Sequence, residues 1–306
     1  MGKIAAAFFS LKAWVFSRFP RSWQTGLGDA LGVALRTLRF RRKVIRQNLE
    51  IAYGDDLAAR ERLERAAFRH IGNLFLEIFL VLVPGQVMGR FLGRWSELRG
   101  QEHWRAALAR GKGAIFLSSH VGNWEIMAGT GATHGIDLMI VTKHLKPEWL
   151  HRAIERGRAR YGVKGTYEPR TMKDILRFLR DGKTIGIVLD QYAGPPLGVR
   201  VPFFGRPVGT SSALAALHKR TEAPILPVVN YRLPNGRFVV EIFPALAWIS
   251  DENSFRELAL NTARYAEVVE QHVRAHPEQW LWSHRRFKGD LSPLKPGEWD
   301  SARGRH

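Results

Sequence analysis

The sequence predicts an α/β fold in which a mostly parallel central sheet is covered by helices on both faces. From about residue 96, short apolar runs of strand length alternate with longer segments of helical composition. Such alternation is typical of a parallel sheet with helices packed on it. The chain before this point contains aromatic, basic segments of helical character. The predicted fold is therefore an α/β domain with an N-terminal helical, membrane-associating extension.

The individual elements follow from apolar patterning and from glycines that end helices. The expected strands span 114–118, 138–141, 163–167, 184–189, 225–231 and 238–243. The expected helices span 101–110, 124–133, 147–160, 171–181, 210–221 and 254–275. Upstream, we expect a basic helix over 36–49 and an apolar helix over 68–77 in which Glu77 is a paired structural carboxylate. Between 190 and 209 the chain is expected to be irregular.

No Gly/Ser-rich or Pro-rich linker divides the chain, so we expect one domain over 36–288. The polar tail, 289–306, is expected to fray. The N-terminal segment, 1–35, begins with an apolar run that Lys12 and Arg18 interrupt, short of the ~20 apolar residues that span a bilayer. We expect an amphipathic helix at the membrane interface; a signal peptide and an ordinary packed helix are the alternatives. The side chains expected in lipid are Phe8, Phe9, Trp14 and Phe16, and those expected on lipid phosphates are Lys3, Lys12, Arg18 and Arg21.

The charge balance limits the class of partner. Forty-seven Lys and Arg residues oppose 28 Asp and Glu residues, which gives a formal net charge of +19. This excess indicates a nucleic acid, an anionic membrane surface, or an acidic carrier with a phosphorylated substrate. No recognisable nucleic-acid-binding module surrounds the basic runs, so we expect no nucleic-acid partner. The absence of cysteine excludes thiol catalysis, disulfides and thiolate metal sites.

The candidate catalytic stretch joins the strand at 114–118 to the helix at 124–133. His120 follows the strand, Gly122 bends the backbone and Asn123 is placed to cap the helix. Within one continuous helix, five positions would turn Glu125 about 140° away from His120. Across a turn, Glu125 can reach the imidazole, so the spacing predicts an oriented His–carboxylate pair, the minimum for a general base. A purely structural hydrogen bond is the alternative.

A second polar group follows the strand at 184–189. Asp190 and Gln191 come directly after it, and ligand sites collect at the carboxyl ends of parallel strands. We expect the Gly- and Pro-rich chain that follows to bring backbone amides at Gly205 and the guanidinium of Arg206 near an anionic group. A surface loop without a role in the site is the alternative.

Three blocks carry a resemblance to a known family. His120-Val121-Gly122-Asn123-Trp124-Glu125 resembles the H-x-x-x-x-[D/E] motif of the glycerolipid-type acyltransferases, and in its Gly-Asn-Trp-Glu form it is most similar to the late acyltransferases of lipid A biosynthesis, the lauroyl/myristoyl transferases. Asp190-Gln191 with the later Pro-Phe-Phe-Gly-Arg-Pro run, 202–207, resembles a second block of this family. The stretch 277–288 resembles its Trp-x-Trp-x-His-x-Arg ending.

The resemblance implies acyl transfer from a thioester to a hydroxyl, with acyl carrier protein as donor and a phosphorylated, Kdo-bearing lipid A precursor as acceptor. It places the enzyme at the cytoplasmic face of a bacterial inner membrane, either peripheral or held by a single N-terminal anchor. His120 would be the base, Glu125 would fix its tautomer, and no metal or organic cofactor is required. The expected substrate-binding residues are Asn123, Arg158, Arg160, Arg170, Asp190, Gln191, Gly205, Arg206 and Arg285.

Two alternatives stay open at this point. The same chemistry fits another acceptor, such as a phosphatidylinositol mannoside, an aminolipid or a lysophospholipid, with acyl-CoA as donor. A basic membrane-binding protein without catalytic activity would share the charge and the aromatic N-terminus. Backbone amides near Gly122 or Gly205, or an arginine, are candidates to stabilise the tetrahedral oxygen.

Overall fold

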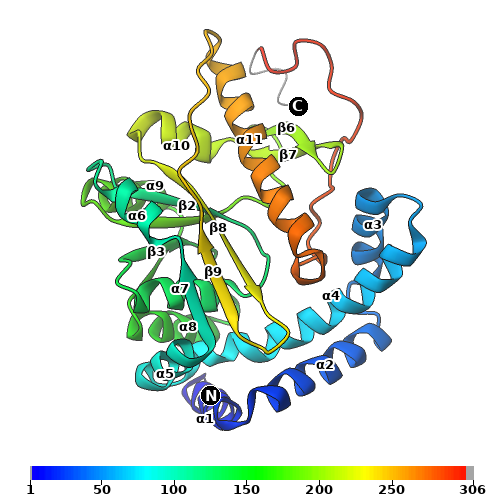
Figure 1. Ribbon diagram of the computed structural model, residues 1–306, viewed down its shortest axis with the longest axis vertical. Coiled ribbons are helices and arrows are strands. Elements are labelled where there is room, and N and C mark those ends of the chain that lie inside the picture. Colours follow the sequence, from blue (N-terminus) through cyan, green and yellow to red (C-terminus); the bar gives the residue numbers. More distant parts are fainter. Residues whose placement is uncertain (1, 301–306) are drawn as a thin grey trace.

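The computed structural model describes residues 2–300, with the backbone alone for residues 2, 3, 5 and 6. A seven-stranded sheet in the order β1-β9-β8-β2-β5-β3-β4 forms the centre, and a separate two-stranded hairpin, β6-β7, lies beside it (Figure 1). All pairs in the large sheet are parallel except the antiparallel pair of β8 and β9. The strands are β1 (Ser96–Arg99), β2 (Ala114–Ser118), β3 (Leu138–Val141), β4 (Val163–Thr166), β5 (Thr184–Val188), β6 (Gly198–Phe203), β7 (Arg206–Ser211), β8 (Ile225–Arg232) and β9 (Phe238–Ile242).

The helices lie on both faces of the sheet and along one end of it (Figure 1). They are α1 (Gly2–Arg18), α2 (Arg21–Thr37), α3 (Arg42–Tyr53), α4 (Leu57–Glu77), α5 (Gly85–Trp95), α6 (Gln101–Leu108), α7 (Trp124–Thr133), α8 (Glu148–Arg160), α9 (Thr171–Arg180), α10 (Ala213–Thr221) and α11 (Ser254–Ala275), with the short 3₁₀ segments η1 (Ile78–Leu82) and η2 (Pro277–Gln279). The predicted α/β architecture with a mostly parallel, helix-covered sheet is confirmed.

The central strand β2 is buried along its whole length. Its side chains alternate between the two faces of the sheet. Ile115 and Leu117 pack in the core with α9, α10 and α11, while Ala114 and Phe116 pack in a second core with α5 and α7. An unbroken apolar run is what a parallel strand covered on both faces requires, and β2 therefore presents its carboxyl end, and the residues after it, at the edge of a rigid sheet.

Three local predictions were wrong. The part of the stretch expected to be irregular that begins at Gly198 forms the β6-β7 hairpin, and the helix expected from 210 begins at Ala213. The basic helix expected over 36–49 is interrupted, because Arg39 and Arg41 adopt positive φ between the end of α2 and the start of α3. Leu38, expected on the apolar side of that helix, lies in the interruption and is 78% exposed.

The N-terminal helices pack on the body of the protein rather than forming a separate unit. A Cβ atom at Gly72 of α4 would lie 2.1 Å from the carbonyl oxygen of Gly28, so glycine is what allows α2 and α4 to approach this closely. Phe9 of α1 stacks on Phe79 and Trp149, with centroid distances of 5.3 and 5.6 Å. None of the helices in the described range is long and apolar enough to cross a bilayer.

These contacts correct part of the expected membrane face. Phe9 and Phe16 pack against the core rather than pointing outward, whereas Phe8 and Trp14 are exposed. Arg21, expected on lipid phosphates, is buried and donates to Glu77 at 2.6 Å. The side chain of Lys3 lies outside the described residues.

The C-terminal segment, expected to fray, is held against the body as far as it is described. The indole Nε1 of Trp299 donates to the carbonyl of Arg200 at 2.9 Å, and Arg200 in turn contacts the carboxylate of Glu298 at 3.2 Å. Leu291 packs on the core that includes α11. Residues 301–306 of the predicted tail lie outside the described range.

Candidate active site

His120 and Asp190 meet at the carboxyl ends of the neighbouring strands β2 and β5. The His120 Nδ1 atom lies 2.8 Å from Oδ1 of Asp190, and the His120 backbone amide donates to Oδ2 at 2.7 Å. Asp190 is 2% exposed. Although burial opposes its charge, the attraction and hydrogen bonds of His120 hold the pKa of the Asp190 carboxyl below its ordinary value. The carboxylate is therefore a permanent acceptor, and it fixes both the ring and the backbone of His120.

The pKa of His120 lies above its ordinary value. Burial alone would lower the pKa of this imidazole, but the Asp190 carboxylate more than offsets that effect through its charge and its hydrogen bond. Because Asp190 only accepts, the proton of the neutral imidazole sits on Nδ1, and the Nε2 lone pair is free to take a proton. The arrangement is that of a general base with its tautomer fixed.

The expected contact between His120 and Glu125 does not form. Glu125 lies in the first turn of α7, where both of its carboxylate oxygens face α8 and bind the guanidinium of Arg158. Its Oε2 accepts from Arg158 Nε at 3.0 Å, and the two side chains are almost completely buried. Burial opposes the charge of Arg158, yet the paired carboxylate raises its pKa. Glu125 therefore forms a buried ion pair beside the site, and Asp190 takes the place expected for it.

The turn between His120 and α7 is held by buried polar side chains. Gly122 has φ +67, and a Cβ atom there would lie 2.2 Å from the carbonyl oxygen of Asn230, so another residue would clash. The amide of Asn123 donates to Oδ1 of Asn230 at 2.7 Å. The Asn123 side chain caps α7, as expected, by accepting from the amides of Glu125 and Ile126 at 3.0 and 3.2 Å. Asn123 thus shapes the loop rather than facing a substrate.

The cap is anchored to the N-terminal helices through Glu77. Asn123 Nδ2 donates to Oε2 of Glu77 at 3.2 Å, and Glu77 also accepts from Arg21 and Arg232. Burial opposes ionisation, but the two guanidinium groups hold the pKa of Glu77 below its usual value. The prediction that Glu77 is a paired structural carboxylate is confirmed.

Three backbone amides of the loop are occupied. Besides those of His120 and Asn123, the amide of Gly122 donates to the carbonyl of Gln279 at 2.9 Å. Gly122 is therefore not free to bind a tetrahedral oxygen, contrary to one of the expected arrangements. Stabilisation of the tetrahedral oxygen by an arginine stays a prediction.

Two residues of the C-terminal segment complete the surroundings of His120. Trp280 Nε1 donates to Oδ2 of Asp190 at 2.7 Å. The ring of His284 stacks on that of His120 with 4.7 Å between centroids, and Trp124 meets His120 edge to face at 4.9 Å. Burial, followed by repulsion from His120, lowers the pKa of His284 to about 4. The imidazole of His120 is thus flanked by the rings of His284 and Trp124.

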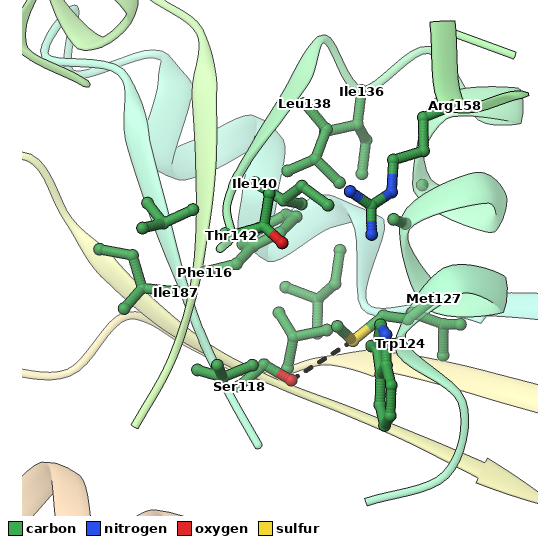
Figure 2. A pocket seen from close by; sticks show the side chains of 18 of the residues that line it. Phe116, Ser118, Trp124, Met127, Ile136, Leu138, Ile140, Thr142, Arg158 and Ile187 are labelled. Atoms are coloured by element: carbon green, nitrogen blue, oxygen red, sulfur yellow. Dashed lines mark hydrogen bonds between the residues drawn. The ribbon is translucent and has the colours of Figure 1, made fainter. Parts of the chain in front are cut away.

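An apolar cavity of about 120 Å³ opens beside His120, between the sheet and α7. Figure 2 shows Ser118 and Trp124 at one end and Ile136 and Leu138 at the other. Ser118 Oγ contacts the sulfur of Met127 at 3.4 Å within it. The lining also includes Leu98, Phe116, Ala128, Gly131, Ile140, Val141, Thr142, Arg158, Gly186, Ile187, Val188, Val228, Val240 and Ile242. A histidine at the mouth of a hydrocarbon-lined cavity fits a substrate with an apolar chain and one reactive polar group.

Among the arginines predicted to bind substrate, Arg158 lines this cavity. Arg160 and Arg170 are exposed and do not line it. Arg206 and Gly205 lie at the exposed turn of the β6-β7 hairpin. Arg285 is exposed in a separate groove that includes Lys43, Asn48 and Lys288.

Gln191 and Arg286 link the site to the end of the chain. The backbone carbonyl of Gln191 accepts from the guanidinium of Arg286 at 3.0 Å. Arg286 is fully buried and also donates to Gly209 and Thr210, so it faces inward. Within residues 2–300 no cluster of His, Cys, Asp and Glu side chains has the composition of a metal site.

Sequence reasoning missed the role of Asp190 as partner of His120 and the presence of Trp280 and His284 beside it. A signal for Asp190 was present, because it follows a buried strand and shares a sheet edge with His120. Trp280 and His284 belong to the C-terminal block that the family resemblance singled out, but no local pattern connects that block to His120.

Comparison with known proteins agrees with this site. A family model described as bacterial lipid A biosynthesis acyltransferase matches residues 3–289. The chain is 25% identical to the lipid A biosynthesis lauroyltransferase of Escherichia coli, with 90% of this chain and 88% of that protein aligned. It is 24% identical to the palmitoleoyltransferase of the same organism, over the same shares.

A second group of relatives is named for a different lipid acceptor of the acyl group. The chain is 29% identical to the phosphatidylinositol mannoside acyltransferase of Mycobacterium tuberculosis, with 81% of this chain and 78% of that protein aligned. The relatives of both groups are named acyltransferases, which agrees with a histidine of fixed tautomer beside an apolar cavity. Because the family model covers almost the whole sequence, the chain belongs to the bacterial lipid A biosynthesis acyltransferase family.

Proposed function

We propose that this protein moves a fatty acyl chain from an acyl carrier protein thioester to a hydroxyl group of a lipid A precursor, with His120 as general base. The observation that carries the proposal is the contact of 2.8 Å between His120 Nδ1 and Asp190, which leaves the Nε2 lone pair to take a proton. Asp190, rather than Glu125, holds the tautomer and stabilises the imidazolium that forms.

The chemistry needs one proton acceptor and no covalent enzyme intermediate. His120 Nε2 takes the proton of the acceptor hydroxyl while its oxygen attacks the thioester carbonyl carbon. When the tetrahedral intermediate collapses, the carbon–sulfur bond breaks and the imidazolium returns the proton to the thiolate. The products are the acylated acceptor and the free thiol, and His120 is again neutral.

The cavity supports an acyl substrate. Its walls are almost entirely aliphatic and aromatic, and it reaches from the side of His120 and Trp124 to that of Ile136. An acyl chain lying in the cavity would place its thioester carbonyl at the mouth, beside the imidazole. Holding the reacting groups in this way lowers the barrier by removing their freedom of motion.

The donor and acceptor are inferred from charge and from relatives. A net charge of +19 favours an acidic carrier protein and a phosphorylated glycolipid. The lipid A acyltransferases among the relatives support a lipid A precursor, while the phosphatidylinositol mannoside acyltransferases support a mannosylated lipid as the second candidate acceptor. Both candidates use the same base and cavity.

We place the protein peripherally at the cytoplasmic face of a bacterial inner membrane. Exposed large apolar side chains concentrate on α1 and α2, where cationic side chains lie between them. They include Ile4, Phe8, Leu11, Trp14, Val15, Trp23, Leu27 and Val33. The guanidinium of Arg18 lies over the ring of Trp14 at 4.4 Å, which is a pairing suited to the lipid–water interface.

The chemistry is tested with purified protein, acyl carrier protein thioesters or acyl-CoA, and each of the two acceptors. We expect acylation of the lipid A precursor and a loss of at least ~10²-fold in His120→Ala. Circular dichroism of the variant would show that its fold is intact. A folded His120→Ala protein with native turnover would exclude His120 as the base, and transfer to the mannosylated lipid alone would favour the second acceptor.

The membrane face is tested by flotation with vesicles that contain anionic lipid. The double variant Leu11→Glu/Trp23→Glu places two carboxylates on the proposed face, where Leu11 is 60% and Trp23 is 65% exposed. Leu197→Glu is the matched control, because Leu197 is 69% exposed but precedes β6, away from α1 and α2 in Figure 1. We expect the double variant alone to lose vesicle binding. Equal binding by all three proteins would argue against this face.

A further inference from the structure

The residues that line the cavity beside His120 can be ordered by their distance from His120 along the strands. The strand register pairs residues of neighbouring strands into rows, and each row lies at one depth in the cavity. Ser118 and Val188 are partners in the row nearest the carboxyl ends of β2 and β5. Phe116, Gly186 and Ile140 form the next row. The third row carries Leu138 opposite Thr184, whose hydroxyl accepts from the indole of Trp104 at 2.8 Å. Leu138 therefore lines the cavity at the amino-terminal ends of the strands, away from His120, and we call this end of the cavity its floor.

Helix α7 runs along the same rows in the opposite direction. Trp124, at its first position, contacts His120, while Met127, Ala128 and Gly131 follow on the face that lines the cavity. Seven residues of helix rise separate Trp124 from Gly131, which amounts to about 10 Å. Gly131 consequently marks the floor of the cavity, next to Ile136.

Nothing in the packing or the backbone demands glycine at position 131. Its φ is not positive, and a Cβ atom there would lie 3.6 Å from Ile136 Cδ1 and 4.0 Å from Leu138 Cδ2, which are ordinary contacts. The neighbouring Gly129 differs, because its Cβ atom would come within 3.0 Å of Leu92 Cδ1 on the other side of the helix. Glycine inside a helix is less stable than alanine. The one structural effect of Gly131 is the open space it leaves at the cavity floor.

We propose that Gly131, together with Ile136, sets the length of acyl chain that the enzyme accepts. This inference rests on the proposed acyl transfer and extends it to the specificity of the same cavity. A methyl group at position 131 would occupy the volume taken by the last carbon atoms of the longest accepted chain. Removing carbon atoms from Ile136, which lies next to Gly131, would extend the cavity instead.

The test is a competition among saturated acyl thioesters whose chains increase by two carbon atoms, supplied together at equal concentration to the full-length protein. Mass spectrometry of the acylated acceptor then reports chain preference independently of overall rate. We expect Gly131→Ala to lose the longest chain used by the native enzyme by about 10-fold or more relative to the next shorter one, since a misfit methylene in an apolar pocket discriminates by about that factor. Ile136→Ala is expected to gain longer chains.

Gly89→Ala is the matched control. Gly89 lies inside α5, has no positive φ, and a Cβ atom there meets nothing within 4 Å. It makes the same chemical change in a helix without touching the cavity, so its product profile should equal the native one. Ile136→Val provides a milder enlargement if Ile136→Ala does not fold.

The possible outcomes separate the two proposals. If the native enzyme acylates the acceptor but Gly131→Ala keeps the native chain profile, Gly131 does not set chain length and this inference is wrong. If the native enzyme transfers no acyl group to any acceptor, the proposed function itself fails. A shorter-chain profile in Gly131→Ala, unmatched by Gly89→Ala, supports the inference.

Discussion

The imidazole of His284 lies stacked on that of His120, with ring centroids 4.7 Å apart and an interplanar angle of 29°. Because burial, followed by the charge of His120, lowers the pKa of His284 to about 4, the second ring is neutral at physiological pH. In the proposed reaction His120 takes up a proton, so a neutral aromatic face lies against the developing imidazolium. An aromatic neighbour of this kind stabilises a cation without competing for its proton.

Replacing His284 should distinguish the stacked ring from its nitrogen atoms. We expect His284→Ala to lower kcat/KM by about fivefold, since aromatic and cation–π contacts are worth about 1 kcal/mol. His284→Phe retains the ring and should recover most of the loss. Steady-state kinetics of the two variants provides the measurement. If His284→Phe is as impaired as His284→Ala, the nitrogen atoms bind substrate or carry a proton.

Asp190→Asn should change both the rate and its pH dependence. The Asp190 carboxylate raises the pKa of His120, and the base is active only when His120 is neutral. Removing the charge lowers that pKa, so the acid limb of the kcat/KM profile should move to lower pH. At its plateau the rate should still fall by about 10²-fold or more, because the amide no longer fixes the tautomer. An acid limb at the native position would show that His120 is not the group that titrates.

The buried pair of Glu125 and Arg158 predicts strong coupling. Arg158→Met leaves the buried charge of Glu125 without its partner, and Glu125→Gln leaves Arg158 only its contact with the half-buried Glu155, so each should cost about 3–5 kcal/mol of unfolding free energy. The double variant removes both charges, so its cost should be well below the sum of the two single costs. Urea unfolding of the four proteins gives the coupling energy. Additive costs would mean that the ion pair contributes little to stability.

The carboxylate of Glu77 holds α2 to the sheet and should be needed for stability. Glu77→Gln leaves the guanidinium groups of Arg21 and Arg232 buried beside a neutral amide, and we expect a loss of about 3–5 kcal/mol in unfolding free energy. Glu61→Gln is the control, because its ion pair with Arg65 on α4 is largely exposed. Urea titrations of both variants check the difference. A loss no greater than that of Glu61→Gln would contradict the structural role.

Buried neutral histidines predict instability in mild acid. Burial lowers the pKa of His70 to about 3 and that of His272 to about 4, from 6.5 in the unfolded chain. Between the folded and unfolded pKa values, only the unfolded state binds a proton at each histidine. The free energy of unfolding is therefore unaffected above about pH 6.5. It falls as the pH drops toward 4, by about 1.4 kcal/mol per pH unit for each histidine. Urea unfolding at neutral pH and near pH 5 measures this slope. His272→Gln should reduce it by one proton's contribution, and an unchanged slope would assign the acid sensitivity to other groups.

The parts of the fold that were predicted correctly are those in which the local sequence pattern determines the secondary structure. The strand at 114–118 is apolar up to Ser118 because both of its faces are covered. The strand at 184–189 is also mostly apolar, although only Thr184 and Ile185 of β5 are buried. The β6-β7 hairpin was missed because its glycines and prolines suggest an irregular chain, while its pairing joins residues that no periodic pattern connects. Register between strands is set by packing that single-sequence patterns do not contain.

The same distinction between local and distant residues applies to the candidate site. His120 and the cap at Asn123 were predictable because glycine, asparagine and the end of a strand are neighbours in sequence. The partner of His120 was not, because Asp190 lies 70 residues away and Glu125 was the nearest carboxylate along the chain. Arg158, 33 residues from Glu125, binds that nearer carboxylate and leaves the imidazole to Asp190.

The hydrogen bond from Trp280 to Asp190 bears on the order in which the protein is synthesised. Residues 120 and 190 leave the ribosome long before residue 280, so the strands that carry His120 and Asp190 can associate while Asp190 still lacks its indole donor and His120 lacks the ring of His284. Trp280 and His284 close this side of the site. The nascent protein therefore acquires the complete surroundings of His120 only after these two residues have been synthesised, and a chain that stops before Trp280 would carry the motif without them.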